Sequence, residues 1–456
     1  MINPVKKKIV FSIQVELDAP LCVASGKDGL TDADVMQDYD GKPFIPASSI
    51  AGAMRSYLKK DKNSPCLFGY SEGEGGKMSA LFLSDMIFED EAKLLIRDGV
   101  ELDDKKTAVD GSKYDMQMIE AGTKAHFYAE LTIRENNGKE KEFRDSEEDY
   151  VNDLAAALYG INSGKLRMGR KKTRGFGKMK LIQVRKIEFT ADNYLKYAEV
   201  YQEKDVWNEA VWKKKSQEGW HVWESWKEVS SAPSEYMMLQ VPLSLQGGIS
   251  IRQYAARKGE PDFVQMSRLC KSAENGKMTE NAIIPGSSMA GALRHRLKTI
   301  LKTLAANGLD IHVDGILDTM FGYAEKEDAH ISMITINETV IDGAVPFIVT
   351  RTGISRFESS ARHRSLYTEK TFVKGKLNLE IFIRKGIFED YQWMLGFLLL
   401  AIKDLQNGYL AVGGETGIGR GIFKKSGEVL LDGQPLNTDQ TIAEALANLN
   451  RKAGSV

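Results

Sequence analysis

The sequence predicts an α+β protein made of two tandem domains that share one order of elements. The stretch 44–58, FIPASSIAGAMRSYL, recurs almost unchanged at 283–297 as IIPGSSMAGALRHRL, and each copy has the apolar spacing of an amphipathic helix. Around each copy, alternating apolar and polar residues predict strands in the same order, which indicates duplication. The order strand, helix, strand, strand, helix, strand is that of a ferredoxin-like (RRM-like, βαββαβ) domain, so we expect two such domains with long insertions.

The first domain is expected to occupy residues 1–190. A polar stretch at 101–124 is too long for a tight turn and is expected to project from the domain. The expected strands are 8–17, 80–88, 126–134 and the segment after 180; the expected helices are 44–58 and 150–159; the expected loops are 24–42 and 165–180.

The second domain is expected to occupy residues 236–456 and to repeat this order. Its polar insertion is 351–371, and its last loop is rich in glycine, like that of the first domain. The expected strands are 237–245, 331–341, 372–384 and the segment after 423; the expected helices are 283–297 and 390–406; the expected loops are 247–276 and 411–423.

Residues 191–235 form a connector that matches neither domain. Its aromatic residues offer surfaces on which nucleic-acid bases can stack, but at this spacing tryptophans more often fix a connector to its neighbours, and we favour packing. The tryptophans are Trp207, Trp212, Trp220, Trp223 and Trp226.

The composition is that of a globular protein, with 42% apolar and 27% charged residues. The net charge of -1 excludes a uniformly basic nucleic-acid-binding protein, so any such binding has to come from local patches. The cysteines are too far apart in sequence for a zinc motif, and no apolar run reaches membrane-spanning length. We therefore expect a cytoplasmic protein with no membrane partner.

Each repeated helix start has the composition of a phosphate-binding site. A proline ends an extended segment, paired serines offer hydroxyls that can cap the helix, and a glycine lets another backbone approach. The alternative is an ordinary capped helix. The residues are Ser48, Ser49, Gly52 and Arg55 in the first copy and Ser287, Ser288, Gly291 and Arg294 in the second.

The loop 165–180, KLRMGRKKTRGFGKMK, is the strongest nucleic-acid signal, because it has eight basic residues, three glycines and no acidic residue. Bare glycine amides suit a phosphate-binding nest, whereas the alternative is a solvated basic face. The second copy is far less basic. The candidate residues are Arg170, Lys171, Lys172, Arg174, Gly175 and Gly177 in the first copy and Gly417, Gly419 and Arg420 in the second.

The loop before the first repeated helix is rich in aspartate. Carboxylates at this place can hold hydrated Mg²⁺ or accept a proton from a ribose 2′-hydroxyl, although most surface aspartates do neither. The histidines form no pair at metal-ligand spacing. The aspartates are Asp28, Asp32, Asp34, Asp38 and Asp40.

Taken together, these motifs resemble the RAMP superfamily of CRISPR proteins, and most closely a tandem fusion of two backbone subunits of a type III effector complex. The motifs are the PxSSxxG helix start, the following FG dipeptide (LFGY and MFGY) and the glycine-rich loop before the last strand. The resemblance implies that the helix starts and glycine-rich loops hold the phosphates of a guide (CRISPR) RNA. It further implies that the insertions 101–124 and 351–371 are thumbs, and that other subunits of the complex are partners. Apolar residues that could wedge between bases are Met116, Met118 and Ile119 in the first insertion and Phe357 and Leu366 in the second.

The resemblance also implies that a loop aspartate cleaves complementary target RNA with Mg²⁺ or Mn²⁺. Asp32 fits the family order of an aspartate, a nearby valine, a second aspartate and the IPxSS element, with Asp34 as the nearest rival. In the second copy the corresponding residue is Asp262, in a longer loop whose register is open. The alternatives are a guide-RNA scaffold without catalysis and a guide-precursor processing ribonuclease, which the lack of a histidine centre disfavours.

Overall fold

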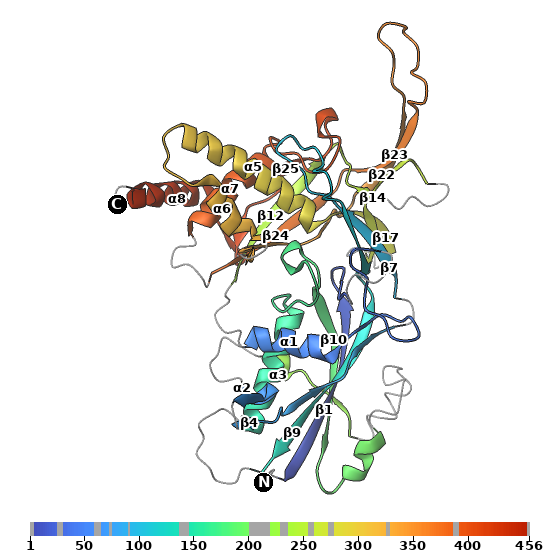
Figure 1. Ribbon diagram of the computed structural model, residues 1–456, viewed down its shortest axis with the longest axis vertical. Helices are drawn as coiled ribbons and strands as arrows, with labels where there is room; N and C mark the ends of the chain where they lie inside the picture. Colours follow the sequence, from blue (N-terminus) through green and yellow to red (C-terminus); the bar gives the residue numbers. More distant parts are fainter. Residues whose placement is uncertain are drawn as a thin grey trace. The chain divides into compact units, whose positions relative to one another are not determined.

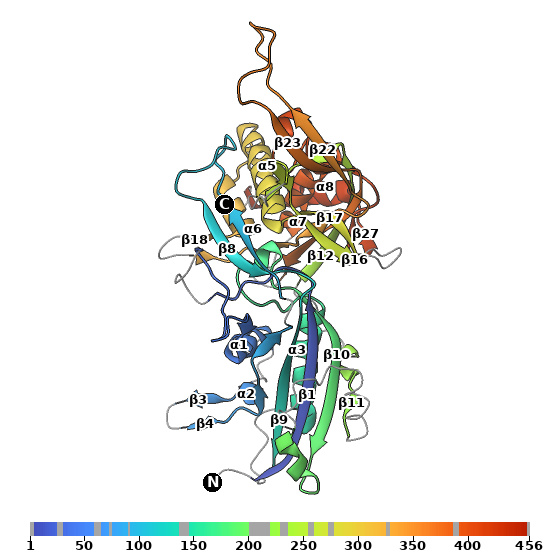
Figure 2. The same ribbon diagram turned by 90° about the vertical axis from the view of Figure 1, so that its right-hand side faces the viewer.

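The computed structural model describes residues 4–24, 31–58, 65–72, 75–89, 92–135, 146–199, 219–228, 236–253, 260–271, 278–324, 329–385 and 392–453 (Figures 1 and 2). It divides into two compact units. The first comprises Met1–Leu95, Met116–Lys172 and Phe176–Ala232. The second comprises Ile96–Asp115, Thr173–Gly175 and Pro233–Val456, and so includes two segments from the first half of the sequence.

The first unit is built on an antiparallel sheet whose central strand is β1 (Val5–Leu17). β1 lies between β10 (Met179–Phe189) and β9 (Lys124–Arg134), and β9 also pairs with β5 (Leu81–Leu83) and β6 (Met86–Phe88). β6 in turn pairs with β2 (Phe44–Ile45). The alternation expected for β1 gives it one face directed into the core.

Helices α1 (Ala47–Leu58) and α3 (Glu147–Asn162) cover that face of the sheet (Figure 1). Ile50 and Met54 of α1 are fully buried, and Leu154 of α3 joins the same core. Ser146 caps α3, because its hydroxyl accepts a hydrogen bond from Asp149 N while Asp149 bonds back to the Ser146 amide.

The second unit repeats this arrangement. Its strands β12 (Tyr236–Gln246) and β24 (Lys376–Arg384) are central, β25 (Ile422–Lys425) lies beside β12, and β20 (Ile334–Ile336) lies beside β24. The covering helices are α5 (Gly286–Ala306) and α7 (Gln392–Gln406), with α6 (Val313–Phe321) packed on α5 and α8 (Thr438–Ala453) packed on α7. The predicted α+β class is confirmed, whereas α8 was not predicted.

Each polar insertion forms a strand pair. In the first half, β7 (Leu94–Gly99) pairs with β8 (Tyr114–Ile119). In the second half, β22 (Val345–Arg351) pairs with β23 (Tyr367–Val373), and the chain between them projects from the sheet (Figures 1 and 2).

Four sequence predictions of strands and loops were wrong. The expected strand 331–341 contains two strands, β20 and β21 (Thr339–Val340), which belong to different sheets. The segment 372–384 is two strands, because Lys374 and Gly375 have φ values of 64° and 96° and turn the chain from one sheet into another. The segment 80–88 likewise divides into β5 and β6. The expected loop 247–276 contains short strands, namely β13 (Gly248–Ile249), β14 (Arg252–Gln253), β15 (Phe263–Gln265) and β16 (Ser267–Lys271).

The described part of the connector packs on the first unit. Trp220, Trp223 and Trp226 are each at most 6% exposed, and the ring centroid of Trp223 lies 4.7 Å from that of Phe11. The packing interpretation is therefore confirmed for these three, while Trp207 and Trp212 lie outside the described residues. No helix in the described ranges is long and apolar enough to cross a bilayer.

Candidate functional site

The two aspartate loops are held by equivalent backbone hydrogen bonds, which we call their shared backbone frame. In the first unit, Met36 N donates a hydrogen bond to Val23 O at 2.9 Å. In the second unit, Met266 N donates to Ile251 O at 2.8 Å. The next strand follows in the same way, since Phe44 N bonds to Met36 O and its counterpart bonds to Met266 O. Met36 and Met266 are therefore equivalent positions.

This equivalence fixes the register that the sequence leaves open. Asp32 and Asp262 precede Met36 and Met266 by the same number of residues, and both side chains are exposed. The longer loop of the second copy, partly outside the described residues, therefore does not displace Asp262 from the position that Asp32 has. Of the other loop aspartates, Asp28 lies outside the described residues.

Asp32 lies in a turn that fixes which way its neighbours point. Thr31 and Ala33 on either side are buried, and Gln117 N donates to Ala33 O at 2.9 Å. The Thr31 hydroxyl donates to Asp34 Oδ1 at 2.7 Å, so Asp34 stabilises the turn itself. This arrangement distinguishes the exposed Asp32 from its sequence rival.

Asp262 has an additional structural contact. Its Oδ2 accepts a hydrogen bond from the backbone amide of Thr368, on β23, at 2.7 Å. The residue after it, Phe263, stacks under the guanidinium of Arg252, which lies 3.7 Å from the ring centroid. The Asp262 carboxylate therefore also helps to hold the strand pair β22–β23 in place.

A divalent ion would receive few protein ligands at either site. Among the described residues, no group of three or more histidine, cysteine, aspartate or glutamate side chains is arranged to hold a metal. Mg²⁺ is commonly bound by one or two carboxylates, with water and substrate phosphates completing its shell. Asp32 and Asp262 fit such an ion only if RNA supplies the remaining ligands.

The repeated helix starts leave one glycine exposed in each unit. A Cβ added at Gly52 or Gly291 would meet no atom within 4 Å, although both lie inside helices. Glycine inside a helix costs about 1 kcal/mol relative to alanine, and no packing contact accounts for it here. Each glycine instead leaves an open strip beside the exposed Ser48 and Ser287.

The serines lie within the first helical turn and do not act as the caps we predicted. In α1 the amide of Ala47 donates to Asp85 Oδ1 at 2.7 Å, and in α5 the cap position is Pro285. Ser49 is exposed and Ser288 is half-buried.

The two helix arginines hold the FG turns. Arg55 Nη2 donates to Gly69 O at 3.4 Å, and Arg294 Nη1 donates to Gly322 O at 3.3 Å. Arg294 also pairs with Asp318 at 2.9 Å. Both arginines thus have the same intramolecular role in the two units.

The two glycine-rich loops have the same backbone conformation. Gly177 and Gly421 have φ values of 73° and 68°, and a Cβ on either would lie 1.9 Å from a backbone carbonyl. Gly177 N donates to Pro20 O, and Gly421 N donates to Gly248 O. The structural role of these glycines is close packing, and their amides are already bonded within the protein.

The charges on the two loops differ. Arg170 and Lys172 of the first loop are exposed, whereas Arg420 of the second is 8% exposed and pairs with Glu369 at 3.1 Å. Arg174 is also engaged, because its Nη2 donates to Phe321 O at 3.1 Å.

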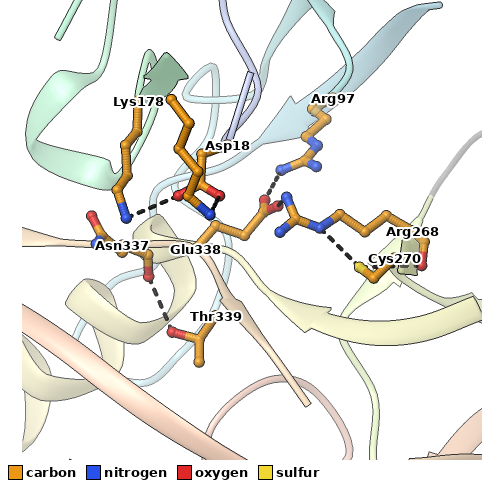
Figure 3. A network of polar contacts seen from close by, with 9 residues as sticks. Asp18, Arg97, Lys178, Arg268, Cys270, Asn337, Glu338 and Thr339 are labelled. Atoms are coloured by element: carbon orange, nitrogen blue, oxygen red, sulfur yellow. Dashed lines mark hydrogen bonds and ion pairs between the residues drawn. The ribbon is translucent and has the colours of Figure 1, made fainter. Parts of the chain in front are cut away.

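The last lysines of the first loop form ion pairs with Asp18. Lys178 lies 2.9 Å from one of its carboxylate oxygens (Figure 3), and Lys180 lies 2.8 Å from the other. Burial alone would raise the pKa of Asp18, but the two lysines outweigh it and lower that pKa. The solvent-facing basic surface of this loop is therefore smaller than its sequence implies.

The prediction of base-wedging residues is wrong for the first insertion. Met116, Met118 and Ile119 are at most 4% exposed and belong to the protein interior. In the second insertion, Phe357 and Leu366 are 101% and 70% exposed, as a wedge requires.

Fold and loops together define a duplicated α+β protein in which a helix start, a glycine-rich loop and an exposed loop aspartate each occur twice. The model of the RAMP superfamily matches residues 14–180 and 270–424, well over half of the chain, and the chain belongs to this superfamily. Membership implies a CRISPR-associated protein that binds CRISPR RNA, in a superfamily that includes ribonucleases. No curated protein matches the chain.

Proposed function

We propose that the protein is a tandem backbone subunit of a type III CRISPR ribonucleoprotein, which holds guide RNA and cleaves complementary target RNA. The observation that carries this proposal is the shared backbone frame of the aspartate loops, which gives both units an exposed aspartate at one equivalent position. Duplication of a fold preserves its packing residues in any case. The shared aspartate is exposed in both copies, and at Asp262 the same carboxylate also accepts a hydrogen bond from Thr368 N.

Each unit is a ferredoxin-like domain in this proposal. In both sheets the last strand of the βαββαβ series lies beside the first, the first beside the third, and the third beside the second. This strand order supports the assignment, and the covering helices lie on one face as such a domain requires.

Guide RNA would lie along the helix starts and the glycine-rich loops. Gly52 and Gly291 leave room for an RNA backbone, the serine hydroxyls beside them can donate to phosphate oxygens, and the helix amides add a favourable dipole. Arg170 and Lys172 would add charge in the first unit alone.

Cleavage would depend on RNA conformation as much as on the aspartates. A-form pairing keeps the 2′-hydroxyl out of line with the adjacent phosphorus, so an inserted thumb that displaces one base pair would free a nucleotide for attack. Asp32 and Asp262 would each hold Mg²⁺ or Mn²⁺ together with RNA phosphate and water, or accept the 2′-proton. The ion, when bound, neutralises charge that develops on the phosphate.

A guide-RNA scaffold without catalysis is the second candidate. The hydrogen bond from Thr368 N gives Asp262 a structural reason to be present, and neither site has a cluster of acidic ligands among the described residues. This candidate predicts guide binding and no cleavage.

The deciding experiment assembles the chain with guide RNA and its neighbouring subunits and adds labelled complementary RNA. We expect cleavage with Mg²⁺ or Mn²⁺ and none in EDTA, with guide binding equal in both. Binding without cleavage in metal would favour the scaffold, and cutting of guide precursor in EDTA would favour a processing ribonuclease.

A further inference from the structure

A ring of contacts between charged side chains begins and ends at Phe263, the residue after the second loop aspartate. Phe263 pairs in parallel register with Glu369, whose carboxylate accepts a hydrogen bond from Arg420 Nη2 at 3.1 Å. Arg420 Nε lies 3.9 Å from Glu415 Oε2, and Glu415 Oε1 lies 3.2 Å from Arg252. The Arg252 guanidinium lies over the Phe263 ring and closes the circle. We call Arg252, Glu369, Glu415 and Arg420 the charge ring.

The charge ring joins three segments of the second unit. Arg252 belongs to β14, which pairs with β15, and Glu369 belongs to β23. Glu415 and Arg420 belong to the glycine-rich loop. Glu369 is 1% exposed and Arg420 is 8% exposed, and a carboxylate this deeply buried needs its cationic partner. The ring therefore fixes the segment after Asp262 to both β23 and the glycine-rich loop.

The first unit has apolar residues at the two most buried positions of the ring. Met116 is the counterpart of Glu369, because each stands three residues before the strand residue of an equivalent backbone pair. These pairs are Leu21 with Ile119 and Ile249 with Phe372. Phe176 is the counterpart of Arg420, because each precedes the close-packed glycine of its loop. Met116 and Phe176 are 4% and 7% exposed, so one backbone accepts an apolar pair in one unit and an ion pair in the other.

Fold stability does not account for the charges of the ring. Replacing a buried ion pair with packed apolar residues of similar volume is often neutral or stabilising, and the first unit shows that such residues fit. Within the described ranges, three buried atoms of the ring have no hydrogen-bond partner, which costs free energy. These atoms are Glu369 Oε1, Glu415 Oε2 and Arg420 Nε. The charges therefore point to a role other than stabilising the core.

The two aspartate loops are also held in different ways. The first loop is closed by its own side chains, through the hydrogen bond from the Thr31 hydroxyl to Asp34. Pro261 and Val264 occupy these two positions in the second unit, and their side chains cannot form that bond. The charge ring supplies a constraint from outside the second loop, where the first loop has one of its own.

We propose that Glu369 and Arg420 are positioning residues for cleavage at Asp262. This inference rests on the proposed function and specifies what holds its second site in a reactive geometry. Both side chains are buried, so they act through Phe263 and the backbone of β23 and not by contact with RNA. Replacing them with the apolar pair of the first unit should preserve the fold and release the Asp262 loop.

Cleavage of one labelled target RNA by the assembled complex in Mg²⁺ tests this role. Glu369→Met/Arg420→Phe should slow the cut that Asp262→Asn abolishes by at least about tenfold, since a misplacement of about 1 Å can cost about a hundredfold in rate. The Asp32-dependent cut in the same RNA is the internal standard and should keep its rate. The KM for target, the guide affinity and the melting temperature should also stay as in the wild type.

Lys370→Met is the matched control. Lys370 follows Glu369 on the same strand, and its ion pair with Glu280 at 2.9 Å is partly exposed and lies outside the ring. This variant should leave both cuts unchanged. A lowered melting temperature of the Glu369→Met/Arg420→Phe variant, with both cuts slowed alike, would make the pair purely structural and overturn the inference.

Hydrogen exchange of the full chain gives a readout that needs no cleavage. The Thr368 amide, which donates to Asp262, should exchange faster in the double variant than in the wild type or in Lys370→Met. Equal exchange of this amide would overturn the inference, and so would an unchanged Asp262-dependent cut. A wild-type complex that binds guide and makes neither cut would refute the proposed function instead, and the exchange measurement then decides on the charge ring alone.

Discussion

Lys171 and Glu415 occupy the same left-handed position in the two glycine-rich loops, with φ values of 53° and 55°. The backbone is thus the same while the charge is reversed. Non-glycine residues adopt this conformation rarely, so the shared geometry indicates that the loop shape has a role of its own. Attraction of phosphate, by contrast, has to be strongest at the first copy.

Replacing Arg170 and Lys172 together with alanine should weaken guide RNA binding. Both side chains are exposed, so the loss is electrostatic. The slope of log affinity against log salt should fall by about 1.4, or about 0.7 per lost phosphate contact on single-stranded RNA. A salt titration measures this, with Lys227→Ala as the matched control on an exposed lysine. An unchanged slope would exclude the basic loop as a phosphate site.

Gly52→Ala and Gly291→Ala should separate stability from binding. Each substitution removes a helix glycine in open space, so the free energy of unfolding should rise by about 0.5–1 kcal/mol. RNA affinity should nevertheless fall, because the new methyl group occupies the open strip. Thermal denaturation and filter binding test the two effects, and stabilised variants with wild-type affinity would show that no RNA backbone lies there.

Trp223→Ala should destabilise the first unit by about 3–5 kcal/mol, since it removes a large buried side chain packed on Phe11. Val222→Ala is the control, because Val222 is its neighbour and is 44% exposed. Denaturant titration measures both. Equal, small effects would mean that the connector contributes little to this core.

The ion pairs of Asp18 should make the first unit sensitive to acid. The pKa of Asp18 is lower in the folded protein than in the unfolded chain, so the pairs stabilise the fold above about pH 4 and lose that effect as the pH falls further. Asp18→Asn should therefore cost about 1 kcal/mol at pH 7 and clearly less near pH 3. Unfolding measured at both pH values tests this, and a pH-independent difference would contradict it.

Periodicity and the repeat were sufficient to predict the two sheets and their covering helices. The β1 and β12 strands and the helix starts follow directly from alternation and from the PxSSxxG copies. The break at Lys374–Gly375 was not predictable, because the apolar pattern continues across it and only the left-handed backbone separates the strands.

The sequence predicted which residue types make up the candidate site, but not which of these residues are engaged in contacts inside the protein. The sequence could not show that Arg174 and Arg420 are engaged internally, because their partners Phe321 and Glu369 are distant in the chain. Nor could it exclude Met118 as a wedging residue. A strand that packs in the core and a strand that inserts between bases have the same apolar residues, and only burial separates them. Burial and long-range hydrogen bonds decide both points.

Asp32→Asn and Asp262→Asn test the catalytic assignment without removing oxygen acceptors. Asparagine keeps a carbonyl for Thr368 N at the second site, so neither variant should lose more than about 1 kcal/mol of stability or any guide affinity. Asp262→Ala, which removes that acceptor, is the control for a purely structural effect.

The most direct measurement maps the ends of target RNA cut by the assembled complex in Mg²⁺. Two cuts separated by the footprint of one unit are expected from the wild type; Asp32→Asn should abolish one, Asp262→Asn the other, and the double variant both. Survival of both cuts in the double variant, with metal present, would contradict the account and assign cleavage to another residue or another subunit.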